Sequence, residues 1–200
     1  MTPNDTAYLA IHYQNENCHR DGNIKVGMGR ECPWREERLG NARRSIGIAR
    51  AAGIPIIHVR LAVRPDFADV TVNTPIIAEW VENNAWREGT WGTEFLEGFD
   101  PVDGDFVVTH TRNSALYGCD TEAILRALGT QQLIVSGVST AYAVEGTVRH
   151  ATDMGFACTV IADACSTATE IQHEGALRAM TPLATIMTVA EFASTVQGNA

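Results

Sequence analysis

Short apolar runs alternate along this chain with amphipathic stretches, and this alternation restricts the fold more than any other feature. Strands as apolar as these are typical of a parallel sheet that is covered on both faces. Helical spacing of the apolar residues between the runs is typical of helices that connect parallel strands. We therefore predict an α/β fold of three layers, with a doubly wound, six-stranded, mostly parallel sheet between helices.

The apolar runs give six predicted strands, and the amphipathic stretches give four predicted helices. The strands are expected at residues 7–11, 54–59, 106–109, 133–136, 157–162 and 184–189. The helices are expected at residues 35–52, 120–128, 140–154 and 173–180. Residues 61–105 are too long for a plain connection and contain three of the four tryptophans, so this stretch is predicted to form a lid or a binding wall.

Composition narrows the class of protein. A length of 200 residues predicts one domain spanning residues 1–200. The formal charge of −9 argues against a nucleic-acid partner, which needs a basic face. No apolar stretch is long enough to suggest a membrane span, and no basic leader precedes an apolar run, so we expect a cytoplasmic protein. The five cysteines form no CxxC pair and are expected to be reduced thiols.

Two histidines follow predicted strands. In an open parallel sheet, ligands bind beyond the carboxyl ends of the strands, where strand order reverses. His12 follows the first predicted strand and His110 follows the third. Both side chains are therefore expected at the ligand-binding edge of the sheet.

Several segments, in their order and spacing, resemble the isochorismatase-like cysteine hydrolases. They are AIHYQNE (10–16), IPIIHVRLAVRPD (54–66), EGTWGTEF (88–95), VVTHTRNSALYG (107–118), SGVSTAYAVEGTVRHATDMGF (136–156) and IADACST (161–167). The resemblance covers nearly the whole chain. It implies a six-stranded parallel sheet, a small polar substrate and a homo-oligomer, either a dimer or a tetramer.

The same resemblance implies an Asp–Lys–Cys triad, and all three positions differ in this chain. The Asp position is His12, in the segment that reads His-Tyr-Gln-Asn. The Lys position is His110, four residues before Ser114. The Cys position is Ala143, three residues after Thr140. No lysine replaces the missing one, because the single lysine, Lys25, lies in another segment.

These substitutions exclude one mechanism and suggest another. A methyl group at Ala143 cannot form the covalent intermediate that a thiolate forms. His12 and His110 can each donate or accept a proton near neutral pH, so together they could act as general acid and base. We expect both side chains to face one cavity, within reach of a shared proton.

Other residues are assigned to the site by position. The turn at Ser139 and Thr140 is expected to hold a developing oxyanion with its backbone N–H groups, although both side chains could also be plain helix N-caps. The resemblance implies a cis peptide bond before Ser139. Substrate contacts are assigned to Gln14, Trp91, Arg112 and Tyr142. Arg60 and Arg64 could also bind an anion, but salt bridges to acidic residues are at least as expected.

Three functions remain open on this reading. The first is a cysteine-independent hydrolase, or a related acid–base enzyme, that acts on a small polar metabolite, a carboxylate among the candidates. The second is a non-catalytic family member that binds a small molecule or a partner. The third is a metal-dependent hydrolase that uses His12 and His110, with His58 as the third histidine nearby. The first reading involves no metal and no cofactor.

Overall fold

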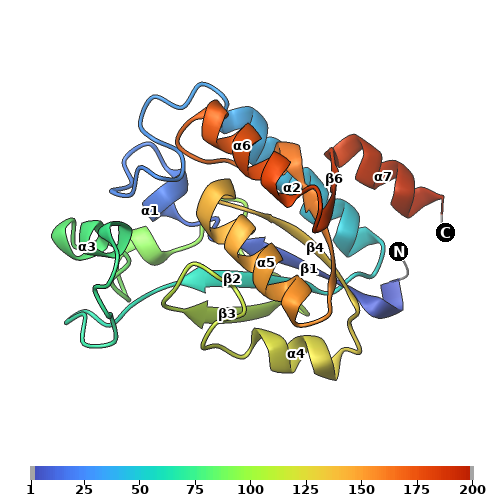
Figure 1. Ribbon diagram of the computed structural model, residues 1–200, viewed down its shortest axis with the longest axis horizontal. Coiled ribbons are helices and arrows are strands. Elements are labelled where there is room, and N and C mark those ends of the chain that lie inside the picture. The colour runs from blue at the N-terminus through green and yellow to red at the C-terminus, as the bar shows by residue number, and fades with distance from the viewer. Residues whose placement is uncertain (1–2, 199–200) are drawn as a thin grey trace.

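Six parallel strands form one sheet at the centre of the computed structural model, which describes residues 3–198 (Figure 1). The strand order is β3-β2-β1-β4-β5-β6, so strand order reverses at β1. The strands are β1 (Thr6–Ile11), β2 (Ile56–Leu61), β3 (Phe106–His110), β4 (Gln132–Gly137), β5 (Ala157–Ile161) and β6 (Ala184–Met187). The predicted three-layer α/β fold with a parallel sheet is thus confirmed.

Helices cover both faces of the sheet (Figure 1). One layer holds α2 (Arg35–Ala51) and α7 (Val189–Gln197), and the other holds α4 (Thr121–Ala127), α5 (Glu145–Asp153) and α6 (Glu170–Met180). Two further helices, α1 (Asn15–Cys18) and α3 (Pro75–Glu82), belong to the loops that follow β1 and β2. Short turns complete the chain, namely η1 (Pro3–Asp5), η2 (Trp91–Thr93), η4 (Ala162–Ala164) and the π turn η3 (Thr140–Val144).

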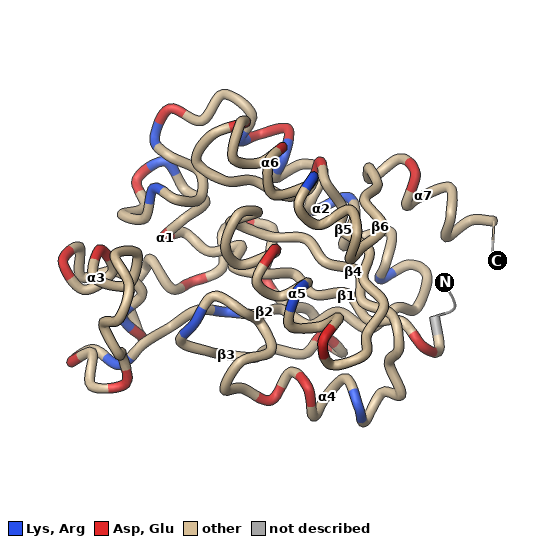
Figure 2. The backbone as a smooth tube through the Cα atoms, in the orientation of Figure 1, with Lys and Arg blue, Asp and Glu red and all other residues tan. Residues whose placement is uncertain are grey.

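Strand β1 shows why the apolar runs are continuous. Its side chains point alternately to the two faces, and both faces are covered by helices. Tyr8 packs in the core beneath α2, whereas Leu9 packs in the core beneath α5. Charged residues lie mainly on helices and loops, and β1 and β4 carry none (Figure 2). Within residues 3–198, no helix combines the length and apolarity needed to cross a membrane.

Differences from the predicted elements fall at boundaries, in loops and at the C-terminal helix α7. The helix predicted at residues 140–154 begins as the π turn η3 and becomes regular only at Glu145. The loop that follows β2 contains α3, which the sequence pattern did not predict. Helix α7 was also missed, although Thr188 and Glu191 form a capping box whose spacing is visible in the sequence.

Two exposed glycines in α2 provide a test of the helix. A Cβ atom added at Gly40 or Gly47 would meet nothing within 4 Å beyond the backbone of the helix itself, and both positions lie on the solvent side. Because glycine is about 0.5–1 kcal/mol less favourable than alanine inside a helix, we expect Gly40→Ala and Gly47→Ala each to raise the free energy of unfolding by that amount. Urea denaturation measures the change.

The matched control is Gly137→Ala at the end of β4. A Cβ there would lie 2.6 Å from the backbone oxygen of Ile11, and backbone of a central strand cannot move away cheaply. We expect this substitution to destabilise the protein. A stabilised Gly137→Ala would contradict the packing of β4 against β1.

Candidate active site

The two predicted histidines meet at the carboxyl edge of the sheet. His12 directly follows β1, and His110 is the last residue of β3. Strand β2 lies between these strands, so the two side chains meet beyond the end of β2. Their Nε2 atoms are 2.5 Å apart, a short hydrogen bond between buried rings. The structure therefore brings the two side chains into direct contact. The sequence predicts only that both face one cavity.

Backbone geometry decides which atom of the pair carries the proton. The Nδ1 atom of His110 lies 3.0 Å from the carbonyl oxygen of Ser114, and a carbonyl can only accept. In the neutral ring, Nδ1 of His110 is therefore protonated and its Nε2 accepts. His12 must then donate from Nε2, which leaves its Nδ1 atom without a proton.

Burial keeps both rings neutral. It lowers the pKa of His12 well below 6.5, and the neighbouring His110 lowers it further, whereas the Val138 carbonyl raises it. Burial also lowers the pKa of His110 to about 4, opposed by the hydrogen bond to the Ser114 carbonyl. Both changes have one cause, because a charged imidazolium loses its hydration inside the protein. The pair is thus neutral at pH 7.

The backbone of His12 is left-handed, with a φ of 55°. Trp86 is also left-handed, with a φ of 62°, and its ring centroid lies 6.2 Å from that of His12. Such a conformation is uncommon for histidine and rarer for a bulky residue such as tryptophan. Strain of this kind persists only where the surrounding structure holds it, and it clusters at functional sites.

A small cavity lies in front of His12. Its volume is about 20 Å³, enough for about one water molecule. The lining residues are His12, Asn17, Ile24, Val26, Leu61, Ile76, Trp80, Trp86, Asn113, Val138, Ser139 and Ala143. His110 is not among them, so His12 faces the cavity and His110 lies behind it. This differs from the expectation that both histidines face the cavity.

The turn after β4 places Ala143 and Ser139 in the cavity wall. The peptide bond between Val138 and Ser139 is cis, as the resemblance implies. The N–H of Thr140 donates to the Ser166 carbonyl at 2.8 Å, so it is not available for an oxyanion. Within residues 3–198, the N–H of Ser139 has no hydrogen-bond partner and remains available. Of the two N–H groups predicted to hold an oxyanion, only that of Ser139 is thus free of a hydrogen bond.

Thr140 instead belongs to a buried network. Its Oγ1 atom lies 2.9 Å from Nδ1 of His173, whose Nε2 accepts from Arg38 at 3.0 Å. Neither Ser139 nor Thr140 makes a side-chain cap to the helix. Burial, aided by the Arg38 charge, lowers the pKa of His173 to about 4. His173 thus links the turn at Thr140 to Arg38 on α2.

Two residues assigned to substrate contacts lie elsewhere. The side-chain amide of Gln14 donates to the carbonyl groups of Leu61 and Thr93, and its oxygen accepts from the Leu61 N–H. It is fully buried, does not line the cavity, and joins the segment after β1 to the end of β2 and to η2. Trp91 is 47% exposed and lines a separate depression beside His19. It is not a wall of the His12 cavity.

Arg112 and Tyr142 also lie outside the cavity. Arg112 donates to the Thr71 carbonyl and to Asn73, and it lines a surface groove of about 470 Å³. This groove shares Ile76 and Asn113 with the cavity. Tyr142 is half-buried and lines neither space.

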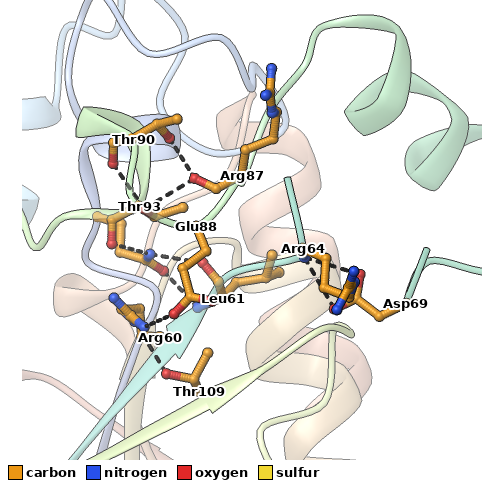
Figure 3. A network of polar contacts seen from close by, with 10 residues as sticks. Arg60, Leu61, Arg64, Asp69, Arg87, Glu88, Thr90, Thr93 and Thr109 are labelled. Carbon is orange, nitrogen blue, oxygen red and sulfur yellow. Dashed lines mark hydrogen bonds and ion pairs between the residues drawn. The ribbon is translucent and has the colours of Figure 1, made fainter. Parts of the chain in front are cut away.

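The remaining arginines near the strand ends are paired with acidic groups. Arg60 contacts Glu88 at 3.3 Å and donates to the Thr109 hydroxyl (Figure 3). Arg64 forms a 2.8 Å ion pair with Asp66. Of the two roles that the sequence allows for Arg60 and Arg64, the structure shows the salt bridges.

The geometry of the histidine pair bears on the metal-dependent alternative. Two nitrogens bound to one tetrahedral zinc lie roughly 3.3 Å apart, given Zn–N bonds of about 2.0–2.1 Å. The Nε2 atoms of His12 and His110 are closer than this, so the rings would have to separate. His58 cannot join them, because it packs beneath α2 with its Nε2 atom 3.0 Å from Asp105. In residues 3–198, no three His, Cys, Asp or Glu side chains are grouped to hold a metal.

Sequence reasoning missed Trp80 and Trp86, both of which line the cavity. Each is 2% exposed, and neither indole Nε1 has a hydrogen-bond partner. Leaving a buried donor unpaired costs about 1–3 kcal/mol. The only sequence signal was the concentration of tryptophan in residues 61–105, which could not show which ring reaches the site.

Comparison with known proteins identifies the family. The isochorismatase domain matches residues 6–191 of the chain. This protein belongs to the isochorismatase family. Ureidoacrylate amidohydrolase RutB of Agrobacterium fabrum (strain C58 / ATCC 33970) is 24% identical over 178 residues, which cover 82% of this chain and 77% of that protein. The uncharacterized isochorismatase family protein YecD of Escherichia coli O157:H7 is 29% identical over 161 residues, or 78% and 82% of the two chains.

Solved structures of the family share the same fold. The cysteine hydrolase of Pseudomonas syringae pv. phaseolicola 1448A has a TM-score of 0.89 at 19% identity, and the match covers 100% of this chain and 96% of that one. At this identity the likeness shows the fold alone. RutB is named an amidohydrolase and the Pseudomonas syringae protein a cysteine hydrolase, and this isochorismatase-family chain shares the fold of the latter.

The neutral buried histidines predict acid sensitivity. Below pH 6.5 the histidines become protonated in the unfolded chain, whereas His110 and His173 stay neutral in the folded chain until about pH 4. The free energy of unfolding therefore falls as the pH drops toward about 4. Each such histidine contributes up to about 1.4 kcal/mol per pH unit. We expect His173→Gln to reduce this slope between pH 6.5 and 5, measured by urea denaturation. The free energy of unfolding at pH 8, where histidines are neutral in both states, measures the effect of the substitution on packing. An unchanged slope of unfolding free energy against pH would contradict a neutral His173.

Proposed function

We propose that this isochorismatase-family protein is a cysteine-independent hydrolase in which His12 is the general base and His110 positions it. The substrate is a small carbonyl compound, with an amide or ureido C–N bond as the first candidate because a relative is named an amidohydrolase. Assembly as a homo-oligomer stays part of the proposal. The observation that carries it is the buried Nε2–Nε2 contact, which directs the unprotonated Nδ1 atom of His12 away from His110.

The proton inventory supports hydrolysis by activated water. His12 Nδ1 takes a proton from a water molecule in the cavity, and the resulting hydroxide adds to the carbonyl carbon of a substrate that approaches from the neighbouring groove, past Ile76 and Asn113. The His12 imidazolium keeps its Nε2–H bond to His110. The Val138 carbonyl, which raises the pKa of His12, favours this protonated form. The proton then passes from His12 to the leaving nitrogen as the C–N bond breaks.

Negative charge develops on the carbonyl oxygen as hydroxide adds, and a hydrogen-bond donor is needed to stabilise it. Ser139 lines the cavity and its N–H donates no hydrogen bond within residues 3–198, so we assign this N–H to that oxygen. Ala143 supplies only a methyl group, which leaves space where relatives of the cysteine type carry a thiol. Water is thus the nucleophile, and no covalent intermediate forms on the chain.

The cysteines are unsuited to replace the missing nucleophile. None of the five lines the cavity of His12. Burial raises the pKa of Cys18 and Cys165 to about 12 and that of Cys158 to about 11, so these thiols stay protonated. Thiolate chemistry therefore has no support at this site.

A non-catalytic binding role is the second candidate. It is favoured by one observation, the small size of the cavity at His12, which holds about one water molecule in this conformation. Both functions need the same cavity, so substitution of His12 separates them.

Replacing the base gives the decisive test. We expect His12→Gln to lower kcat by about 10²–10⁴, because a positioned general base contributes that much. Hydrolysis of small amides, esters and ureido compounds is followed by NMR. For wild type, kcat/KM is expected to be level at neutral pH and to fall on the acid side, where His12 becomes protonated. His110→Gln is expected to lower kcat less and to leave KM nearly unchanged.

The control variant is His19→Gln, at a partly exposed histidine outside the cavity. It is expected to retain wild-type activity. Equal activity of wild type and His12→Gln on every hydrolysed compound would refute the proposed role of His12. A chain that binds but hydrolyses none of these compounds would favour the binding function.

Alkylation tests the independence from cysteine. Iodoacetamide is expected to label the partly exposed Cys32 and Cys119 before the three buried cysteines, with less than a twofold loss of activity. Mass spectrometry assigns the labelled sites. Inactivation that substrate prevents would show that a thiol takes part.

A further inference from the structure

We propose that the cavity at His12 binds the uncharged, hydrogen-bond-accepting end of a small molecule, and that the indole N–H groups of Trp80 and Trp86 donate to it. This assignment rests on the proposed function only in treating the cavity as the substrate site. It names two recognition residues and the chemical class of the group that they recognise.

The first argument is the unpaired donors. Trp80 on α3 and Trp86 after it are both nearly fully buried, and both line the cavity. Their ring centroids are 6.3 Å apart, with the planes at 70°. Neither Nε1 has a partner, whereas Trp34 donates from its Nε1 to Ser166 at 3.1 Å. An indole nitrogen can only donate, so a ligand that satisfies these groups must bring an acceptor.

The second argument is charge. No Lys, Arg, Asp or Glu side chain lines the cavity, and the histidine in it is neutral. Behind the wall, the buried carboxyl group of Glu16 accepts from the backbone N–H groups of Asn23 and Trp86. An anion in the cavity would lose its hydration without gaining a counter-charge, and Glu16 would oppose it. The acceptor is therefore a neutral oxygen, such as that of an amide.

Cations are excluded by the same donors. A cation can lie against an aromatic face, but it brings no lone pair to an indole N–H. Aliphatic side chains, including Ile24, Val26 and Leu61, make up much of the remaining wall. The bound group is thus uncharged, with an oxygen directed at the indoles. The cavity holds about one water molecule in this conformation, so it must widen at its boundary with the groove, at Ile76 and Asn113, to admit more than that oxygen.

The neighbouring groove explains where a charged part of the same molecule would lie. Ile76 and Asn113 line both the cavity and the groove, so they form the boundary between the two spaces. The groove holds Arg112 and His150, whereas the cavity holds no cation. A carboxylated substrate would keep its carboxylate in the groove and present its neutral end to His12. This places the anion-binding role first given to Arg112 outside the reacting centre.

Three planar probes with equal numbers of heavy atoms test the class. Acetamide is neutral with an acceptor oxygen, acetate is an anion, and guanidinium is a cation with no acceptor. The indole ¹⁵N–¹H signals of the four tryptophans are followed by NMR as each probe is added at constant ionic strength. We expect acetamide to move the Trp80 and Trp86 signals downfield and saturably. The Trp34 and Trp91 signals are expected to stay in place, as are all four with acetate or guanidinium.

Trp80→Phe and Trp86→Phe assign the signals and remove one donor each. Each is expected to weaken acetamide binding about 3- to 10-fold, read from the remaining indole, which corresponds to one lost hydrogen bond. Trp91→Phe is the matched control and is expected to bind acetamide as wild type does.

The outcomes separate this inference from the proposed hydrolysis. Saturable shifts with acetate, shifts at Trp91 alone, or no response of Trp80 and Trp86 to any probe would overturn the inference, whether or not His12-dependent hydrolysis is found. Selective acetamide binding by a chain without hydrolytic activity would support the inference while refuting the hydrolase.

Discussion

Strand β1 is the constraint on which the site depends. All six of its residues are at most 2% exposed, and it is hydrogen-bonded to β2 on one side and β4 on the other. Because the strands are parallel, their carboxyl ends open onto one edge, and His12 emerges there in a left-handed turn. The amide of Gln14 then fixes the ends of β1 and β2 to the loop at Thr93. The position of His12 is thus determined by the core rather than by the other residues that line the cavity.

The direct contact between His12 and His110 changes the chemistry that the family frame can support. An Asp–Lys pair would carry two charges, whereas this pair carries none at pH 7, because burial lowers both pKa values. A neutral base beside an apolar wall suits water activation on an uncharged substrate. The same absence of charge underlies the inferred preference of Trp80 and Trp86 for a neutral acceptor. The proposed neutral base and the inferred uncharged ligand therefore both follow from one property, the absence of charged side chains from the cavity wall.

Residues whose placement depends on local sequence were predicted correctly, whereas those whose placement depends on packing between distant segments were not. The parallel sheet and the edge carrying His12 and His110 were predictable, since strand patterns and the order of motifs determine them. The turn at Thr140 was predictable as a turn, but its N–H is taken by Ser166, which lies far away in sequence. The sequence assigns Trp91 to substrate contacts, yet the residue is 47% exposed and lines a depression separate from the cavity at His12.

By itself, the sequence determined the α/β class, the placement of His12 and His110 at strand ends, and the presence of alanine at position 143, which the resemblance assigns to the nucleophile. These depend on local periodicity and on residue identity, which a linear pattern retains. Only the tertiary structure decided that His12 and His110 touch, that one of them faces the cavity, and that Trp80 and Trp86 form its wall with unpaired donors. The physical reason is that contacts between distant segments depend on how loops pack against the sheet, and burial, which sets the pKa values, exists only after that packing.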